Sequence, residues 1–326
     1  MPEPRKHHYL SQFYLRGFSV NGRSICQIEK RGGRAYVSSI RDTAATRDYH
    51  ELDYPGADDP NVVEKRLAQI ETTLAEGLRR AIESGIATPE THTKIIELVT
   101  LLRVRVPAFK TSIEAFLQKV VRSVGVMLER RGELPAAPKG FDDLLRMENL
   151  SITISNWKIL EIMFKIAADR RLFDMLTAMK PAILRAPEGT FFLTCDQPVA
   201  LFHPTAFSTD AYGVRLADPA IEVSVPLSSR VLLFLSWPTN PAAVSYATDR
   251  EATIHEVVEF NRRTVVMADS LVFAPELSQW AVVTAARYSH CSAGVDLDVL
   301  DGGGDFLHLA RFRPVMRPDR YDALSN

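Results

Sequence analysis

The residues with the greatest capacity for chemistry stand near the start of the chain, in the run RKHHYLSQFYLRGF over residues 5–18. The adjacent His7 and His8 could supply a general base and a general acid near neutral pH, or act as metal ligands. Gln12 and Arg16 are four residues apart and share one face of a helix, where they could orient a phosphate or a carboxylate. The structural alternative is that the histidines cap this short helix while the aromatic residues fill a core.

A second candidate is the carboxylate of Asp196, within the run FLTCDQPV over residues 192–199. This pattern predicts an acidic side chain at the carboxyl end of a strand, a place where many active sites are assembled. Pro198 favours extended backbone in the residue before it. An Asx-turn, in which the carboxylate of Asp196 binds nearby backbone N–H groups, explains the same residues equally well.

Two arginines, Arg103 and Arg105, interrupt the otherwise apolar run LVTLLRVRVP. Burying an unpaired arginine is costly, so we expect at least one of them to meet a carboxylate or an anionic ligand. An internal salt bridge is the default alternative to a ligand. The polar segment Asp48–Glu51 could also join a site, and a solvated loop explains it equally well.

Composition narrows the classes of protein that are compatible with the chain. Its 326 residues are 46% hydrophobic and 24% charged, values that exclude a disordered chain, a collagen-like repeat and a disulfide scaffold. The formal net charge of -1 excludes bulk coating of nucleic acid. Residues 1–34 nevertheless contain seven Lys and Arg against two acids, so a small anionic or nucleotide ligand at the N-terminal motif remains compatible.

The sequence predicts a cytoplasmic protein with no membrane segment. Cys26, Cys195 and Cys291 are far apart, which argues against a disulfide framework and against a zinc cluster built on cysteine. The run MPEPRKHHYL lacks the apolar stretch of a secretory signal. The apolar run around residues 231–237 is far shorter than the ~20 residues that span a bilayer.

Hydrophobic spacing predicts the elements that must position these side chains. We expect a short helix over 10–16 that ends with Gly17 in the left-handed conformation, followed by strands over 24–30 and 34–40. Further helices are expected over 60–84, 88–107, 108–130, 142–147, 156–179 and 250–267. Further strands are expected over 191–194, 198–202, 221–225, 231–237, 271–273 and 306–311.

This segregation of helices and strands predicts an α+β fold. The middle of the chain is helix-rich, a small β element lies near the N-terminus, and the C-terminal half contains a mixed or antiparallel sheet. We expect one large domain over 1–326, with 1–135 and 141–326 as the alternative subdivision.

The run HHYLSQFYLRGF resembles the opening signature of a mostly bacterial group, domain-of-unknown-function family 4238. The segment around Asp196 is similar to the Ser-Asp-Asn-Pro-Val motif of that family, and VPLS over 225–228 is similar to its Pro-Leu-Ser element. Asn261 stands where the family tends to keep an asparagine. The three motifs together span residues 6–228, most of the chain, and the resemblance implies no assigned reaction.

The chain departs from the family pattern at three positions. Ser11 stands where proline is usual, and Cys195 and Gln197 stand where serine and asparagine are usual. Because Asp196 and Pro198 match the family motif, a role for the carboxylate of Asp196 is retained. A role that requires the asparagine amide of the motif is not retained, because this chain has Gln197 at that position.

These residues indicate a hydrolase that acts on a phosphate-bearing substrate, either a nucleic acid or a nucleotide. A divalent metal ion could assist the hydrolysis. The expected catalytic residues are His7, His8 and Asp196, and the expected substrate-binding residues are Gln12, Arg16, Arg103, Arg105 and Asn261. The alternative is a non-catalytic ligand-sensing or protein-interaction module in which the motif residues are structural.

Overall fold

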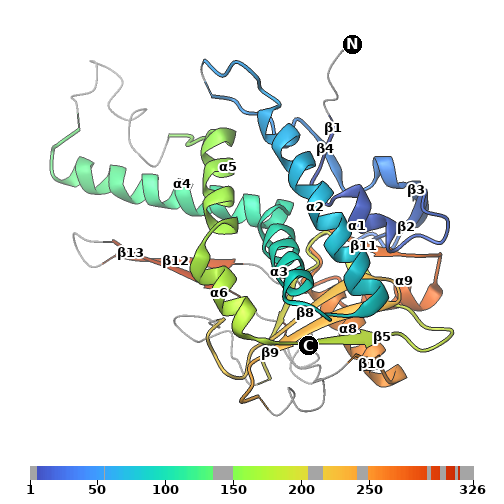
Figure 1. Cartoon of the computed structure of the whole chain (residues 1–326). Helices are drawn as coiled ribbons and strands as arrows, with labels where there is room; N and C mark the ends of the chain where they lie inside the picture. The colour runs from blue at the N-terminus through green and yellow to red at the C-terminus, as the bar shows by residue number, and fades with distance from the viewer. Residues whose placement is uncertain are drawn as a thin grey trace.

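A five-stranded sheet with the strand order β10–β5–β9–β8–β7 lies at the centre of the computed structural model (Figure 1). Its strands are β5 (Lys180–Arg185), β7 (Ala200–Phe202), β8 (Glu222–Ser228), β9 (Val231–Ser236) and β10 (Arg250–Glu251). Neighbouring strands are antiparallel except β10 and β5, which are parallel. The sheet is therefore mixed, and the fold is α+β as the sequence predicts. The structure describes residues 6–54, 56–134, 150–204, 216–240, 249–291, 295–301, 306–312 and 315.

Both faces of this sheet are buried, because the apolar residues of its central strands point in both directions. On one face, residues such as Ile183, Leu233 and Val225 join a core shared with the helices α2 (Val62–Ser84), α3 (Pro89–Val104) and α6 (Arg170–Ala178). On the opposite face, Leu184 and Phe234 join a second core with helix α8 (Ile254–Met267). The sheet is thus enclosed between two layers of helix.

A four-stranded antiparallel sheet has the order β3–β2–β11–β6. The strands β2 (Ser24–Glu29) and β3 (Ala35–Ser39) confirm the predicted N-terminal β element. The strands β6 (Thr194–Cys195) and β11 (Leu271–Ala274) extend it from the second half of the chain. Main-chain pairing of β2 with β11 therefore joins segments more than 240 residues apart in sequence, as the register of Cys26 with Ala274 shows.

Side-chain caps mark the start of several helices. The hydroxyl of Thr88 accepts the N–H of Thr91 at the start of α3, and Thr253 and Glu256 form a capping box on α8. The segment predicted as one helix over 156–179 is two, α5 (Asn156–Ala167) and α6, because Asp169 caps the second. The remaining helices are α4 (Pro107–Arg130) and α9 (Gln279–Arg287). The helix expected over 142–147 lies outside the described residues.

Helix α1 (Gln12–Arg16) confirms the short helix of the N-terminal motif, but the conformation expected of Gly17 is wrong. Gly17 has a φ of -63°, in the right-handed region. A Cβ atom at this position would lie 3.1 Å from the carbonyl oxygen of Leu227, and the Gly17 carbonyl accepts the N–H of Ser229 at 2.8 Å. Glycine is therefore favoured by the close approach of the β8 backbone, and not by its φ.

Two shorter pairs of strands complete the described elements. Strand β1 (Lys6–His8) pairs with β4 (Ala45–Arg47), and the short 3-10 helix η1 (Ile40–Asp42) precedes β4. The hairpin of β12 (Val295–Asp301) and β13 (Phe306–Phe312) lies beside α4 (Figure 1). None of the helices in the described part of the chain has both the length and the apolar composition needed to cross a membrane.

Candidate functional site

The two adjacent histidines of the N-terminal motif occupy different environments. Both belong to β1, where His7 is opposite Thr46 and His8 is opposite Ala45. Successive side chains of a strand point to opposite faces. His7 is consequently buried, at 1% exposure, whereas His8 is half-buried and lines a surface cavity. The structure therefore separates the pair into one fully buried residue and one half-buried residue at a cavity.

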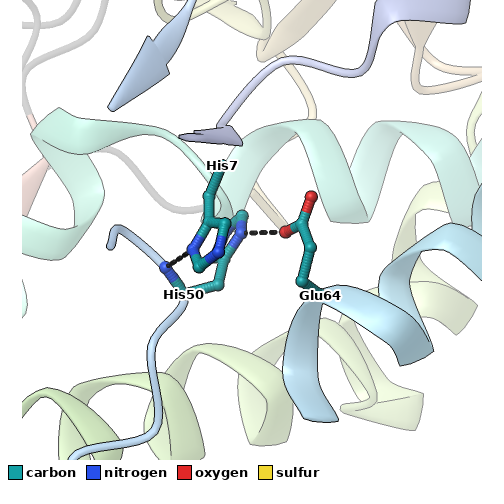
Figure 2. A group of neighbouring side chains, drawn as sticks. All are labelled: His7, His50 and Glu64. Atoms are coloured by element: carbon teal, nitrogen blue, oxygen red, sulfur yellow. Dashed lines mark hydrogen bonds and ion pairs between the residues drawn. The ribbon is translucent and has the colours of Figure 1, made fainter. Parts of the chain in front are cut away.

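His7 belongs to a buried cluster with His50 and Glu64 (Figure 2). The backbone N–H of His50 donates to Nδ1 of His7 at 2.9 Å, and Nδ1 of His50 lies 2.7 Å from Oε2 of Glu64. The two imidazole rings are nearly parallel, with their centroids 5.7 Å apart. The cluster thus joins three elements: β1, the segment after β4, and the first turn of α2.

Burial determines the protonation of this cluster. It lowers the pKa of His50 to about 4, and the hydrogen bond with Glu64 only partly opposes this shift. For Glu64, burial alone would raise the pKa, but the hydrogen bond with His50 and the charges nearby outweigh it, so the pKa lies below its ordinary value. A neutral imidazole and a carboxylate therefore face each other at neutral pH, and His50 donates its Nδ1 proton to Glu64.

The accessible part of the site is a cavity of about 340 Å³ between α1, α2 and the end of α3. His8, Gln12 and Arg16 of the N-terminal motif line it, together with Arg105. Helix α2 closes the opposite side with Glu64, Ala68, Glu71, Thr72 and Ala75. Four of the residues predicted from the sequence to act in catalysis or substrate binding therefore lie around one cavity.

Arg105 connects the N-terminal motif to α2. It is 3% exposed, and its guanidinium binds the carboxylate of Glu71, the carbonyl oxygen of His8 and, at 3.0 Å, the hydroxyl of Ser11. Ser11 in turn donates to Glu71 at 2.7 Å. The salt bridge expected as the default for this arginine is present, and its charge is largely balanced before any ligand binds.

Arg103 is not among the residues that line this cavity. Its side chain lies elsewhere on α3, and burial lowers its pKa to about 10. The two arginines of the run LVTLLRVRVP therefore do not converge on one anion.

Asp196 and Asn261 make backbone contacts away from the cavity. The Asp196 carboxylate accepts the N–H groups of Asp269, Ser270 and Leu271 at 2.9, 2.7 and 2.9 Å. Asn261 accepts the N–H of Leu193 at 2.7 Å and donates to the carbonyl oxygen of Phe191 at 2.8 Å. Both side chains thus connect the segment that carries β6 to neighbouring elements, the kind of role that the structural alternative assigns to Asp196.

The burial of Asp196 makes a testable contribution to the pH dependence of the free energy of unfolding. Burial raises its pKa to about 6 from an ordinary 3.8, and the three backbone amides oppose this shift. A carboxyl group with a raised pKa stabilises the folded state fully below about pH 3.8, and this contribution is lost as the pH rises through 6. We expect the difference in unfolding free energy between wild type and Asp196→Asn to increase by about 1 kcal/mol from pH 7 to pH 5. Denaturant unfolding of both proteins at pH 7 and pH 5 measures this difference in free energy. If the difference decreases from pH 7 to pH 5, the pKa of Asp196 is not raised in the folded protein.

Sequence reasoning did not single out Glu64 and left His50 undecided. Asp48–Glu51 was compatible with either a site or a solvated loop, and the structure buries His50 at 1% exposure. Glu64 stands in the first turn of α2, where an acidic residue is also typical of a helix start. Only the packing of β1 against the segment after β4 brings these residues to His7.

The comparisons with known proteins give a family and no activity. No curated protein and no solved structure matches the chain. The model of the family described as "Protein of unknown function (DUF4238)" matches residues 6–276, which include the N-terminal motif, the cavity, and the segments around Asp196 and Asn261. This is also the family that the run HHYLSQFYLRGF resembles. Because the match covers most of its length, the chain belongs to the DUF4238 family.

Proposed function

We propose that this protein is a hydrolase that binds a small phosphate-bearing substrate in the cavity lined by His8, Gln12 and Arg16. The observation that carries the proposal is the position of these three motif residues around one cavity of about 340 Å³. A cavity of this size holds a small ligand rather than a macromolecular surface. A nucleotide, or the end of a nucleic-acid strand, belongs to the class of ligand that we propose.

Arg16 and Gln12 supply the groups that would bind the phosphate. Arg16 is exposed, and its guanidinium makes no hydrogen bond or ion pair with any residue that the structure describes. Gln12 is one turn earlier on α1, and its amide likewise has no bond to a described residue. A guanidinium can bind two phosphate oxygens at once, and the neighbouring amide can donate to a third.

His8 is the group suited to proton transfer. Burial lowers its pKa, and hydrogen bonding to the backbone of Arg41 only partly opposes the shift, so the ring is neutral at pH 7. Its Nε2 atom is buried and has no hydrogen-bond partner in the described part of the chain. A neutral imidazole at the edge of the cavity could accept a proton from the attacking water. We assign Asp196 no part in this chemistry, because it is not among the residues that line the cavity and its carboxylate accepts three backbone amides.

Steady-state hydrolysis of nucleotides, RNA, DNA and aryl phosphates tests the proposal, with Mg²⁺, Mn²⁺ or Zn²⁺ and without metal. We expect Arg16→Ala to raise KM about 10-fold or more by removing a charged phosphate contact, and His8→Gln to lower kcat about 100-fold by removing the base. Arg31→Ala is the matched control, because Arg31 is also exposed but lies in the turn between β2 and β3. If no substrate is hydrolysed under any of these conditions, or if all three variants match wild type, the proposal fails.

The second candidate function is a ligand-sensing or interaction module. The bonds from Arg105 to Glu71, Ser11 and the backbone of His8 favour it, since they give motif residues a structural role. It predicts that calorimetry detects nucleotide binding to the wild type, that Arg16→Ala weakens this binding, and that no product forms. The same substrate panel therefore distinguishes the two functions.

We also propose a cytoplasmic location. Cys26 and Cys195 are buried thiols that form no disulfide within the described part of the chain. Unpaired thiols are typical of proteins in a reducing compartment.

A further inference from the structure

The imidazoles of His7 and His50 each retain an unused nitrogen in the protein interior. Both residues are 1% exposed. Their Nδ1 atoms are engaged, that of His7 with the backbone N–H of His50 and that of His50 with Glu64. Their Nε2 atoms are buried and have no hydrogen-bond partner in the part of the chain that the structure describes. Buried polar atoms are nearly always paired, so two unpaired ring nitrogens in one cluster indicate a missing ligand.

We propose that His7, His50 and Glu64 form a binding site for a divalent transition-metal ion of the Zn²⁺ class. One ligand atom from each residue lies within 4.8 Å of those of the other two, which is close enough for a single ion to reach all three after small side-chain movements. Two imidazoles and one carboxylate are a typical protein ligand set of a catalytic zinc site, which leaves a fourth position for water or substrate. Figure 2 shows Glu64 pointing from α2 toward the two imidazoles.

The donor atoms determine the class of metal. Imidazole nitrogen favours Zn²⁺ and its transition-metal neighbours, whereas Mg²⁺ and Ca²⁺ prefer sites made of oxygen alone. Nδ1 of His7 accepts the backbone N–H of His50, so the ring has its proton on Nε2. A metal ion at Nε2 of His7 requires this proton to move to Nδ1 of the same ring, so the hydrogen bond from His50 must break when the metal binds.

The position of Glu64 connects this site to the cavity. Glu64 binds His50 on one side and lines the cavity on the other. The charged residues around the cavity are Arg16, Arg105, Glu64 and Glu71, so their formal charges sum to zero. If the proposed hydrolase activity is correct, a divalent ion beside Glu64 would supply the positive charge that a phosphate-bearing substrate requires.

Metal binding can be measured on the full chain without any substrate. After treatment with a chelator and its removal, calorimetric titration with Zn²⁺ is expected to show one ion per chain, with a Kd of about 1 μM or tighter. Titration with Mg²⁺ is expected to show no binding at the same site. X-ray absorption at the zinc edge is expected to show the scattering of two imidazole rings, and this measurement needs no variant.

Variants locate the site. His7→Gln and His50→Gln are each expected to weaken Zn²⁺ binding about 100-fold, and Glu64→Gln about 10-fold or more. His255→Gln is the matched control, because His255 is exposed on α8 and is not part of the cluster. The proposal is overturned if the wild type does not bind Zn²⁺ at about 100 μM. It is equally overturned if the absorption spectrum contains no imidazole, or if folded His7→Gln and His50→Gln bind as tightly as wild type.

The test of the metal site can be distinguished from the test of the proposed hydrolase activity. Arg16→Ala is expected to keep the Zn²⁺ affinity of the wild type, because Arg16 is not part of the cluster, while it raises KM for the substrate. If the protein binds zinc but hydrolyses no substrate, the metal-site proposal is supported and the hydrolase proposal is rejected. If the protein hydrolyses a substrate but binds no transition metal, only the metal-site proposal is rejected.

Discussion

Replacing Asp196 with alanine is expected to lower the free energy of unfolding by about 2–4 kcal/mol. The residue is 5% exposed, and its carboxylate accepts the three consecutive N–H groups of residues 269–271. Its own N–H donates to the carbonyl oxygen of Leu271, so the end of β6 and the start of β11 are bound to each other from both sides. Alanine leaves three backbone donors without their acceptor, and the pairing of β6 with β11 weakens with them.

Denaturant unfolding of wild type, Asp196→Ala and Asp196→Asn measures this effect. Asparagine retains one oxygen, enough for the amides of Ser270 and Leu271, but its NH₂ group then faces the N–H of Asp269. We therefore expect Asp196→Asn to lose about half as much stability as Asp196→Ala. Normal stability of Asp196→Ala combined with lost hydrolysis would contradict the structural role and would support the prediction that Asp196 is catalytic.

Local sequence signals were sufficient to predict the helices and strands that have a clear cap or turn. The Gly-containing turn between two β-rich segments predicted β2 and β3, and Thr88-Pro89 predicted the start of α3. Strand β5 was missed because its sequence, KPAILR, contains a proline and shows no alternation of apolar and polar residues. The capping of α6 by Asp169 was missed because a side-chain cap inside a continuous periodic segment gives no change of period.

Pairing between distant strands could not be predicted from local pattern. The hairpin of β2 and β3 has the same local sequence whether it stands alone or, as here, continues into β11 and β6. The partner of β2 depends on packing across more than 200 residues of sequence, as the pairing of Ile28 with Val272 shows. For this reason the sequence predicted that a β element exists but not which sheet it belongs to.

The same limit applies to the site. The sequence predicted three residues of the cavity, His8, Gln12 and Arg16, as site residues. They lie within one short run, where strand and helix geometry determine which side chains are neighbours. Arg105 was predicted because an arginine in an apolar helix needs a partner, but the identity of that partner, Glu71, comes from the packing of α2 on α3. His50 and Glu64 reach His7 only through tertiary contacts, so no spacing rule connects the three.

Removing the guanidinium of Arg105 is the second change for which we expect a large effect, a loss of about 3–5 kcal/mol in Arg105→Met. Methionine fills much of the same space but leaves the carboxylate of Glu71 without its cation in a largely buried position. It also removes the donors to Ser11 and to the carbonyl oxygen of His8. The strand β1 and helix α1 would then lose the contact that connects them to α2 and α3.

A double-mutant cycle separates the ion pair from the other bonds of Arg105. In Arg105→Met combined with Glu71→Gln no uncompensated carboxylate remains, so we expect the double variant to be more stable than the sum of the single losses by about 2–3 kcal/mol. The exposed pair of Arg79 and Glu83 on α2 provides the control, for which the same cycle is expected to give less than about 1 kcal/mol. Equal coupling in the two cycles would show that Arg105 does not depend on Glu71 for its stabilising role. A large coupling at Arg105 alone would mean that this buried arginine of the cavity mainly stabilises the fold, which leaves Arg16 as the cation available to a phosphate.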